Sequence, residues 1–183
     1  MSTTAIPGIV AAGMQPVWAI DVATLTNITD DTTSIPLTAV TDGQKLDCYY
    51  DFGGLTLDRT ANTRSRQRAC QKVAEEIKIG ETISGTLTIV WDQQKLNSED
   101  PEEQAINAAY KALPEGGEVF LFIAHGWDQD QVPDATTVGD LWRVRVSQIA
   151  HLMAASAEED IMARADLAGS LFVPNVTLTG TAG

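Results

Sequence analysis

Apolar and polar residues alternate most regularly over residues 82–91, TISGTLTIVW. Threonine and serine occupy the even positions up to 88. The odd positions hold apolar side chains and one glycine: Ile83, Gly85, Leu87, Ile89 and Trp91. A period of two with many β-branched residues is typical of a strand that buries one face. The segment therefore predicts a half-buried strand.

Other segments have the apolar, β-branched composition of strands, and they lie on both sides of this one. Four of them cover residues 14–23, 45–51, 118–126 and 141–150. The last segment, residues 163–180, predicts two short strands interrupted at Pro174. The chain is therefore expected to consist mainly of strands.

Side-chain orientation in residues 141–150 follows from the same alternation. Trp142, Val144 and Val146 are expected to face the core. Arg143 and Arg145 are expected to face outward. This strand too is predicted to bury one face.

One segment, residues 98–113, has the period of a helix. Ser98 is the expected N-cap, acidic residues and Pro101 occupy the first turns, and Pro114 ends the segment. Apolar residues form one stripe along the predicted helix: Ala105, Ile106, Ala109, Tyr110 and Leu113. Such a stripe must cover another element, and an exposed sheet face is the expected one.

Strands, one helix and then strands again predict a mainly β (α+β) fold, a β-sandwich or barrel with one packed α-helix. The length suits a single domain, residues 1–183. Residues 1–13 contain no Lys or Arg, so we interpret them as an N-terminal arm and not as a secretory signal. No run of 18 apolar residues occurs, which predicts no membrane span.

Charge is distributed unevenly along the chain. The 25 Asp and Glu residues outnumber the 12 Lys and Arg residues, which gives a net charge of −13. Even so, residues 59–72 contain no acid and five basic residues: Arg59, Arg64, Arg66, Arg68 and Lys72. They lie in a polar, weakly periodic segment, residues 52–80, which we interpret as an extended, protruding basic loop or hairpin. The acidity of the rest argues against tight binding of nucleic acid, which depends on Lys and Arg displacing counterions.

Residues that carry enzymatic or metal chemistry are sparse and poorly grouped. His125 and His151 are the only histidines, and no Cys–His or Ser–His–Asp arrangement is indicated. Cys48 and Cys70 lack metal-ligand spacing, and we interpret them as reduced thiols, with a cross-link between them as the alternative. The acids of SEDPEE, residues 98–103, fit a helix start better than a metal site. We therefore expect no catalytic residues, no cofactor and no metal ion, and a protein that is not an enzyme.

Four segments carry a resemblance to a known family. They are RSRQRACQKVAEEIKIGETISGTLTIVWDQQ, INAAYKALPEGGEVFLFIAHGW, VGDLWRVRVSQI and ADLAGSLFVPNVTLTG. In this order they resemble the major tail proteins, or tail tube proteins, of long non-contractile-tailed bacteriophages that infect actinobacteria. The resemblance covers about residues 14–180 and departs at His125, where Arg or Lys is expected.

The resemblance implies a structural virion protein of the phage tail that is assembled in the host cytoplasm. Subunits of that family form hexameric rings that stack into a tube around the tape measure protein, and tail terminator and distal tail proteins are further partners. DNA later passes through the lumen without specific binding. The sheets of six subunits join into an inner β-barrel, the helix packs outside it, and a long loop reaches a neighbouring ring.

Charge and resemblance together lead to a hypothesis about the basic segment. We expect Arg59, Arg64, Arg66, Arg68 and Lys72 to form a ring-to-ring contact that meets acidic surface on the adjacent ring. The acidic partner would be SEDPEE or WDQDQ, residues 127–131, and the remaining acidity would give a lumen that repels phosphate.

Other interpretations stay open at this point. The basic segment alone could be a solvated loop that aids solubility, or a nucleic-acid patch, although no aromatic residue is interleaved with its basic residues. For the whole chain, the alternative is a soluble β-sandwich binding module such as a capsid decoration or adhesin domain.

Overall fold

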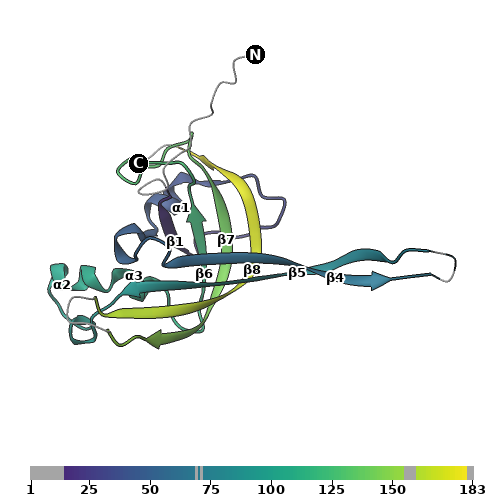
Figure 1. Cartoon of the computed structure of the whole chain (residues 1–183). Coiled ribbons are helices and arrows are strands. Elements are labelled where there is room, and N and C mark those ends of the chain that lie inside the picture. The colour runs from purple at the N-terminus through teal and green to yellow at the C-terminus, as the bar shows by residue number, and fades with distance from the viewer. Residues whose placement is uncertain (1–14, 69, 71, 155–159, 181–183) are drawn as a thin grey trace, which may run out of the picture.

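The structure, a computed structural model, describes residues 15–68, 70, 72–154 and 160–180 (Figure 1). The expected N-terminal arm, residues 1–13, lies outside the described residues. The described chain is mostly antiparallel β-sheet with a few short helices, which confirms the predicted mainly β fold.

Eight strands form one curved sheet in the order β3-β1-β6-β7-β8-β5-β4, and β2 pairs with β8. The β2–β8 pairing is parallel, and the other pairings are antiparallel. The strand bounds are β1 Val17–Asp21, β2 Ser34–Pro36, β3 Gln44–Lys45, β4 Leu55–Arg66, β5 Glu75–Val90, β6 Glu118–Ile123, β7 Val138–His151 and β8 Met162–Thr179.

Two hydrophobic cores lie on opposite faces of the central strands. In β6, Val119 and Leu121 enter the first core, whereas Phe120 and Phe122 enter the second. This explains why the β6 sequence EVFLFI is apolar at successive positions, because both of its faces are buried. Strands β4 and β5 close the first core, and β2 lies over the second. The long strands β7 and β8 contribute to both cores.

The alternation predicted for β5 and β7 is confirmed. Ile83, Leu87 and Ile89 are buried in the first core. In β7, Trp142, Val144 and Val146 are buried in the same core, while Arg143 and Arg145 point away from it.

The helices are shorter than predicted: α1 Leu37–Thr41, α2 Pro101–Ile106 and α3 Ala108–Ala112, with 3-10 turns at Asp47–Tyr49 and Gln93–Lys95. The single helix expected over residues 98–113 is therefore wrong, because the chain bends between α2 and α3 at Asn107 (φ −100°, ψ 12°). The buried Asn107 amide accepts a hydrogen bond from the Asp92 backbone N–H (2.8 Å) and donates one to the Asp92 carbonyl (2.9 Å).

Two details of the predicted helix change with this bend. The N-cap is Asp100 and not Ser98, because the Asp100 side chain accepts a hydrogen bond from the Glu102 N–H (3.0 Å). Ala105 is exposed, and the buried apolar contacts come from Ala109 and Leu113 of the following turn.

Two of the predicted strands also differ. Residues 45–51 do not form a strand: only Gln44 and Lys45 pair with β1, and Asp47–Tyr49 form a 3-10 turn. Residues 163–180 form one strand and not two. The strand continues through Pro174 because Asn175 adopts a left-handed conformation (φ 55°) and donates its backbone N–H to the Asp140 carboxylate (3.1 Å).

Candidate assembly surface

A long two-stranded ribbon projects from the body of the molecule (Figure 1). β4 pairs with β5 from Leu55↔Leu87 to Arg66↔Glu75. β5 pairs with β8 only between Ile83 and Val90, so the outer part of the ribbon has no third strand among the described residues. We call residues 62–80, from the register shift at Asn62/Thr63 outward, the distal hairpin.

The sheet ends at β4 on one side and at β3 on the other. In the described part of the chain, the outer edge of β4 has no strand partner along its 12 residues. An unpaired strand edge of this length presents a row of backbone N–H and C=O groups that can pair with another chain.

Arg59 lies at the base of the ribbon, apart from the other predicted contact residues. Its guanidinium group forms an ion pair with Glu81, with an Nη2–Oε1 distance of 2.6 Å, and lies 4.9 Å from the ring centre of Phe172. Lys78 also pairs with Glu81. The ion pair lies within the ribbon, and the contact with Phe172 of β8 joins the ribbon to the body of its own subunit.

The other four predicted residues lie on the distal hairpin. Arg64 and Arg66 are exposed on β4, opposite Ile77 and Glu75 of β5. Arg68 and Lys72 are exposed in the connection between the strands. The distal hairpin carries five basic and two acidic residues, so its net charge is positive in an acidic protein.

Exposed apolar side chains accompany these charges, and sequence reasoning missed them. Ile79 is 65% exposed, Ile77 is 39% exposed and Val73 is 77% exposed. Glu81 and the register shift opposite Asn62 and Thr63 interrupt the alternation of β5, and Ile79 and Ile77 follow beyond the point at which the subunit's own core ends. Exposed apolar side chains grouped outside a subunit's own core are typical of an interaction surface.

The face of β4 and β5 that points away from the first core is rich in hydroxyl groups. By register it carries Thr56, Thr60, Thr82, Ser84, Thr86 and Thr88. The Thr56 and Thr86 hydroxyls lie 3.0 Å apart. On β8 the same face carries an ion pair between Arg164 and Asp166 (3.2 Å). α3 packs on the opposite side, against the first core.

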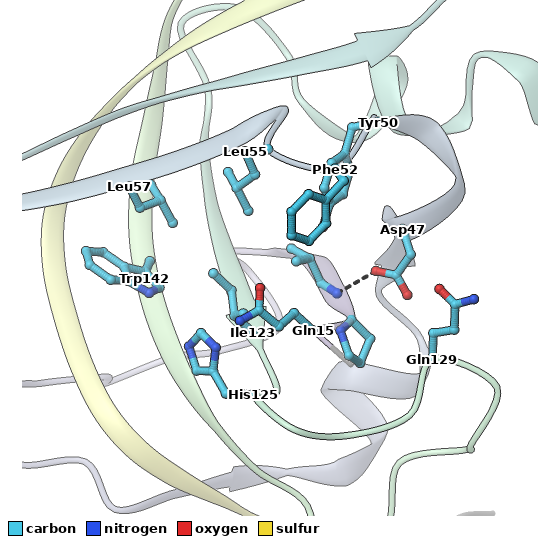
Figure 2. Close-up of a pocket in the computed structure, with 13 residues that line it drawn as sticks. Gln15, Asp47, Tyr50, Phe52, Leu55, Leu57, Ile123, His125, Gln129 and Trp142 are labelled. Atoms are coloured by element: carbon cyan, nitrogen blue, oxygen red, sulfur yellow. Dashed lines mark hydrogen bonds between the residues drawn. The ribbon is translucent and has the colours of Figure 1, made fainter. Parts of the chain in front are cut away.

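A cavity of about 430 Å³ lies beside the base of the ribbon (Figure 2). Phe52, Leu55 and Leu57 line it from the β4 side, and Trp142 and Ile123 line the opposite wall. Phe52 is 80% exposed. A hollow of this size and lining is typical of a binding pocket.

Asp47 supplies a carboxylate to the cavity wall. Its Oδ1 accepts a hydrogen bond from the Val17 N–H (2.6 Å), and its buried Oδ2 lies 3.4 Å from Lys45 Nζ as an ion pair (Figure 2). Burial raises the pKa of Asp47 above its ordinary value. Burial, with the nearby Asp47 charge, raises the pKa of the Tyr50 hydroxyl to about 12. The Trp142 Nε1–H is likewise buried and lacks a partner among the described residues.

The two acidic segments considered as partners differ in their surroundings. In SEDPEE two of the four acids are engaged at the start of α2: Asp100 caps the helix, and Glu103 accepts a hydrogen bond from Ser98 Oγ (2.7 Å). In WDQDQ, Gln129 lines the cavity, and its carbonyl accepts a hydrogen bond from Lys45.

The histidines and cysteines are placed separately. His125 Nε2 lies 3.3 Å from an Asp140 carboxylate oxygen, and the ring of His151 stacks on Trp91 at 3.9 Å. Cys48 and Cys70 are both free and exposed. In the described residues no group of three or more His, Cys, Asp or Glu side chains could hold a metal ion. No helix in that part of the chain has the length and apolar character needed to cross a bilayer.

Comparisons with known proteins give the following. A family model described as phage tail tube protein matches residues 7–172. A search of curated protein sequences found no match. Among solved structures, the SPP1 tail tube, a hybrid structure from solid-state NMR and cryo-EM, matches with 12% sequence identity and a TM-score of 0.48, covering 91% of this chain and 80% of that chain.

Proposed function

The chain belongs to the phage tail tube protein family, whose members are structural proteins that self-assemble into the tail tube, and we propose that it does so as stacked hexameric rings through which DNA is ejected into the host. The observation that carries the proposal is the distal hairpin. It projects beyond its own subunit with exposed isoleucines and a positive net charge. A head-to-tail contact of this kind generates an open filament and not a closed pair.

Lateral assembly within a ring would use the open edges of the sheet. The outer edge of β4 and the opposite edge at β3 are the two ends of the strand order. Pairing such edges between neighbouring copies would satisfy their backbone groups and continue the sheet around the ring.

The hydroxyl-rich face of β4, β5 and β8 is the proposed wall of the lumen. The helices α2 and α3 lie on the other side of the first core, which would place them outside the tube. This face is rich in threonine and serine, and its Arg164 is paired with Asp166. Hydroxyl groups and paired charges would let DNA pass without being held, because tight phosphate binding needs uncompensated Lys and Arg.

The further partners are proposals from family membership. We propose that the tube encloses a tape measure protein, meets tail terminator and distal tail proteins, and is assembled in the cytoplasm of an actinobacterial host. In this role the protein acts as a structural component and not as an enzyme.

Charge reversal on the distal hairpin tests the ring-to-ring contact. Arg64→Glu/Arg66→Glu is expected to give a folded subunit that assembles tubes poorly, because the hairpin would then meet acidic surface with like charge. Wild-type assembly should also weaken as salt rises, because exposed charges are screened over about 8 Å at physiological ionic strength.

The matched control is Lys95→Glu/Lys111→Glu, which changes the net charge equally but lies outside the hairpin. Sedimentation of tubes and negative-stain electron microscopy measure the outcome. Tubes of normal length from the hairpin variant at physiological salt would show that the distal hairpin is not the contact.

A further inference from the structure

We propose that the distal hairpin of one subunit docks into the cavity beside Phe52 of a second copy. The inference rests on the proposed function and names the receiving surface for the hairpin. It selects the cavity and the adjoining WDQDQ loop, and not the start of α2, as that surface.

The hairpin offers an apolar and a basic group on the same face. Arg64 and Ile77 are a cross-strand pair, so their side chains project from the same side of the ribbon. Ile77 and Ile79 both remain exposed in the isolated subunit. A surface that binds them has to supply an apolar hollow with negative charge nearby.

The cavity meets both requirements. Its wall is largely apolar: Phe52 and Leu55 line one part of it, and Leu57 and Trp142 line another (Figure 2). Two of its lining residues carry buried polar atoms without hydrogen-bond partners, Asp47 Oδ2 and Trp142 Nε1. A guanidinium or ammonium group that entered beside an isoleucine would add a second cation near the Asp47 carboxylate, which already pairs with Lys45.

Charges around the cavity are complementary to the hairpin. Asp51 adjoins Phe52, and Asp128 and Asp130 flank Gln129, so with Asp47 four carboxylates stand at or next to lining residues. Lys45 is the nearby base, and it already pairs with Asp47. The positive hairpin therefore meets a negative surface, an arrangement that sets the register of a contact.

The hairpin cannot occupy the cavity of its own subunit. Leu57 of β4 lines the cavity, and the strand leads away from it toward Arg64, opposite Ile77. Seven residues of extended strand span about 23 Å. The occupant is therefore a second copy, and the geometry makes the contact head to tail.

Cross-linking of assembled tubes tests the inference. In a Cys48→Ser/Cys70→Ser background, which removes both native cysteines, Phe52→Cys is combined with Ile77→Cys. A short bis-maleimide is then added to preassembled tubes. Head-to-tail docking converts the monomer band into a ladder of covalent multimers, and variants with only one of the two cysteines give no ladder.

The outcomes separate this inference from the proposed function. Well-formed tubes without a ladder would overturn the docking site and leave tube assembly intact. A cross-link from Phe52→Cys to Ile6→Cys in place of Ile77→Cys would assign the cavity to the N-terminal segment and also overturn it. Failure of the wild-type protein to form tubes at all would count against the proposed function itself.

Discussion

Replacing Ile77 and Ile79 with threonine should impair assembly without weakening the subunit. Threonine is β-branched like isoleucine, so the variant Ile77→Thr/Ile79→Thr keeps the strand preference of the ribbon. Neither side chain belongs to the subunit's own cores, and Ile77 is partly covered within the ribbon, so the subunit's free energy of unfolding should change by less than about 1 kcal/mol.

The magnitude follows from the exposed surface. Ile79 and Ile77 are 65% and 39% exposed, so together they expose about as much as one whole isoleucine. Burying one isoleucine contributes about 1.5–3 kcal/mol. Threonine keeps one methyl group, so we expect a loss of about 1–2 kcal/mol for each docked hairpin. This corresponds to a rise of about 5- to 30-fold in the concentration needed for assembly.

The assay is sedimentation of tubes across a range of subunit concentrations, with thermal unfolding measured on dilute subunits. Ile77→Leu/Ile79→Leu is the matched control, because it keeps the number of apolar carbons, and its assembly threshold should stay within about twofold of the wild type. A threonine variant that assembles at the wild-type threshold would refute the argument that these side chains are buried between subunits.

Three further predictions concern the body of the subunit. Gly85→Ala should lower the free energy of unfolding by about 1–3 kcal/mol, because a Cβ there would lie 2.1 Å from the Thr56 carbonyl oxygen. An unchanged denaturation midpoint would show that β4 and β5 can separate freely at this point. Burial raises the pKa of Asp47 above 3.8, so the folded protein binds this proton more tightly than the unfolded chain. The free energy of unfolding of the wild type, relative to Asp47→Asn, should therefore fall as the pH rises above 3.8. Parallel curves of unfolding free energy against pH for the two proteins would contradict this. Ser84→Lys on the hydroxyl-rich face should give tubes that retain short duplex DNA in co-sedimentation, whereas the control Gln104→Lys on α2 should not. Equal retention of DNA by the two variants would show that this face does not line the lumen.

The sequence predicted elements whose alternation matches burial on one face. Residues 82–88 and 142–147 show it most clearly, because their core-facing positions are apolar or glycine and the positions between them are polar. The helix was only partly predicted. Asn107 interrupts it through hydrogen bonds to the backbone at Asp92, a contact that depends on tertiary structure.

The ribbon was harder to predict as strands. Its β4 sequence, LTLDRTANTRSR, loses its apolar alternation after Leu57, because neither face of the outer ribbon meets the subunit's own core. The available signal was the apolar pair Ile77 and Ile79, which stands beyond Glu81 in an otherwise polar segment. The cavity had no local signal, since it is lined by residues from Gln15 to Trp142 that only the folded sheet brings together.

Cryo-electron microscopy of the concentrated wild-type protein tests the central claim most directly. We predict stacked rings that form a tube, with each β4–β5 ribbon crossing into the neighbouring ring and the helices α2 and α3 outside. Isolated monomers at millimolar concentration, under conditions in which the subunit is folded, would contradict the claim and favour a self-sufficient binding module.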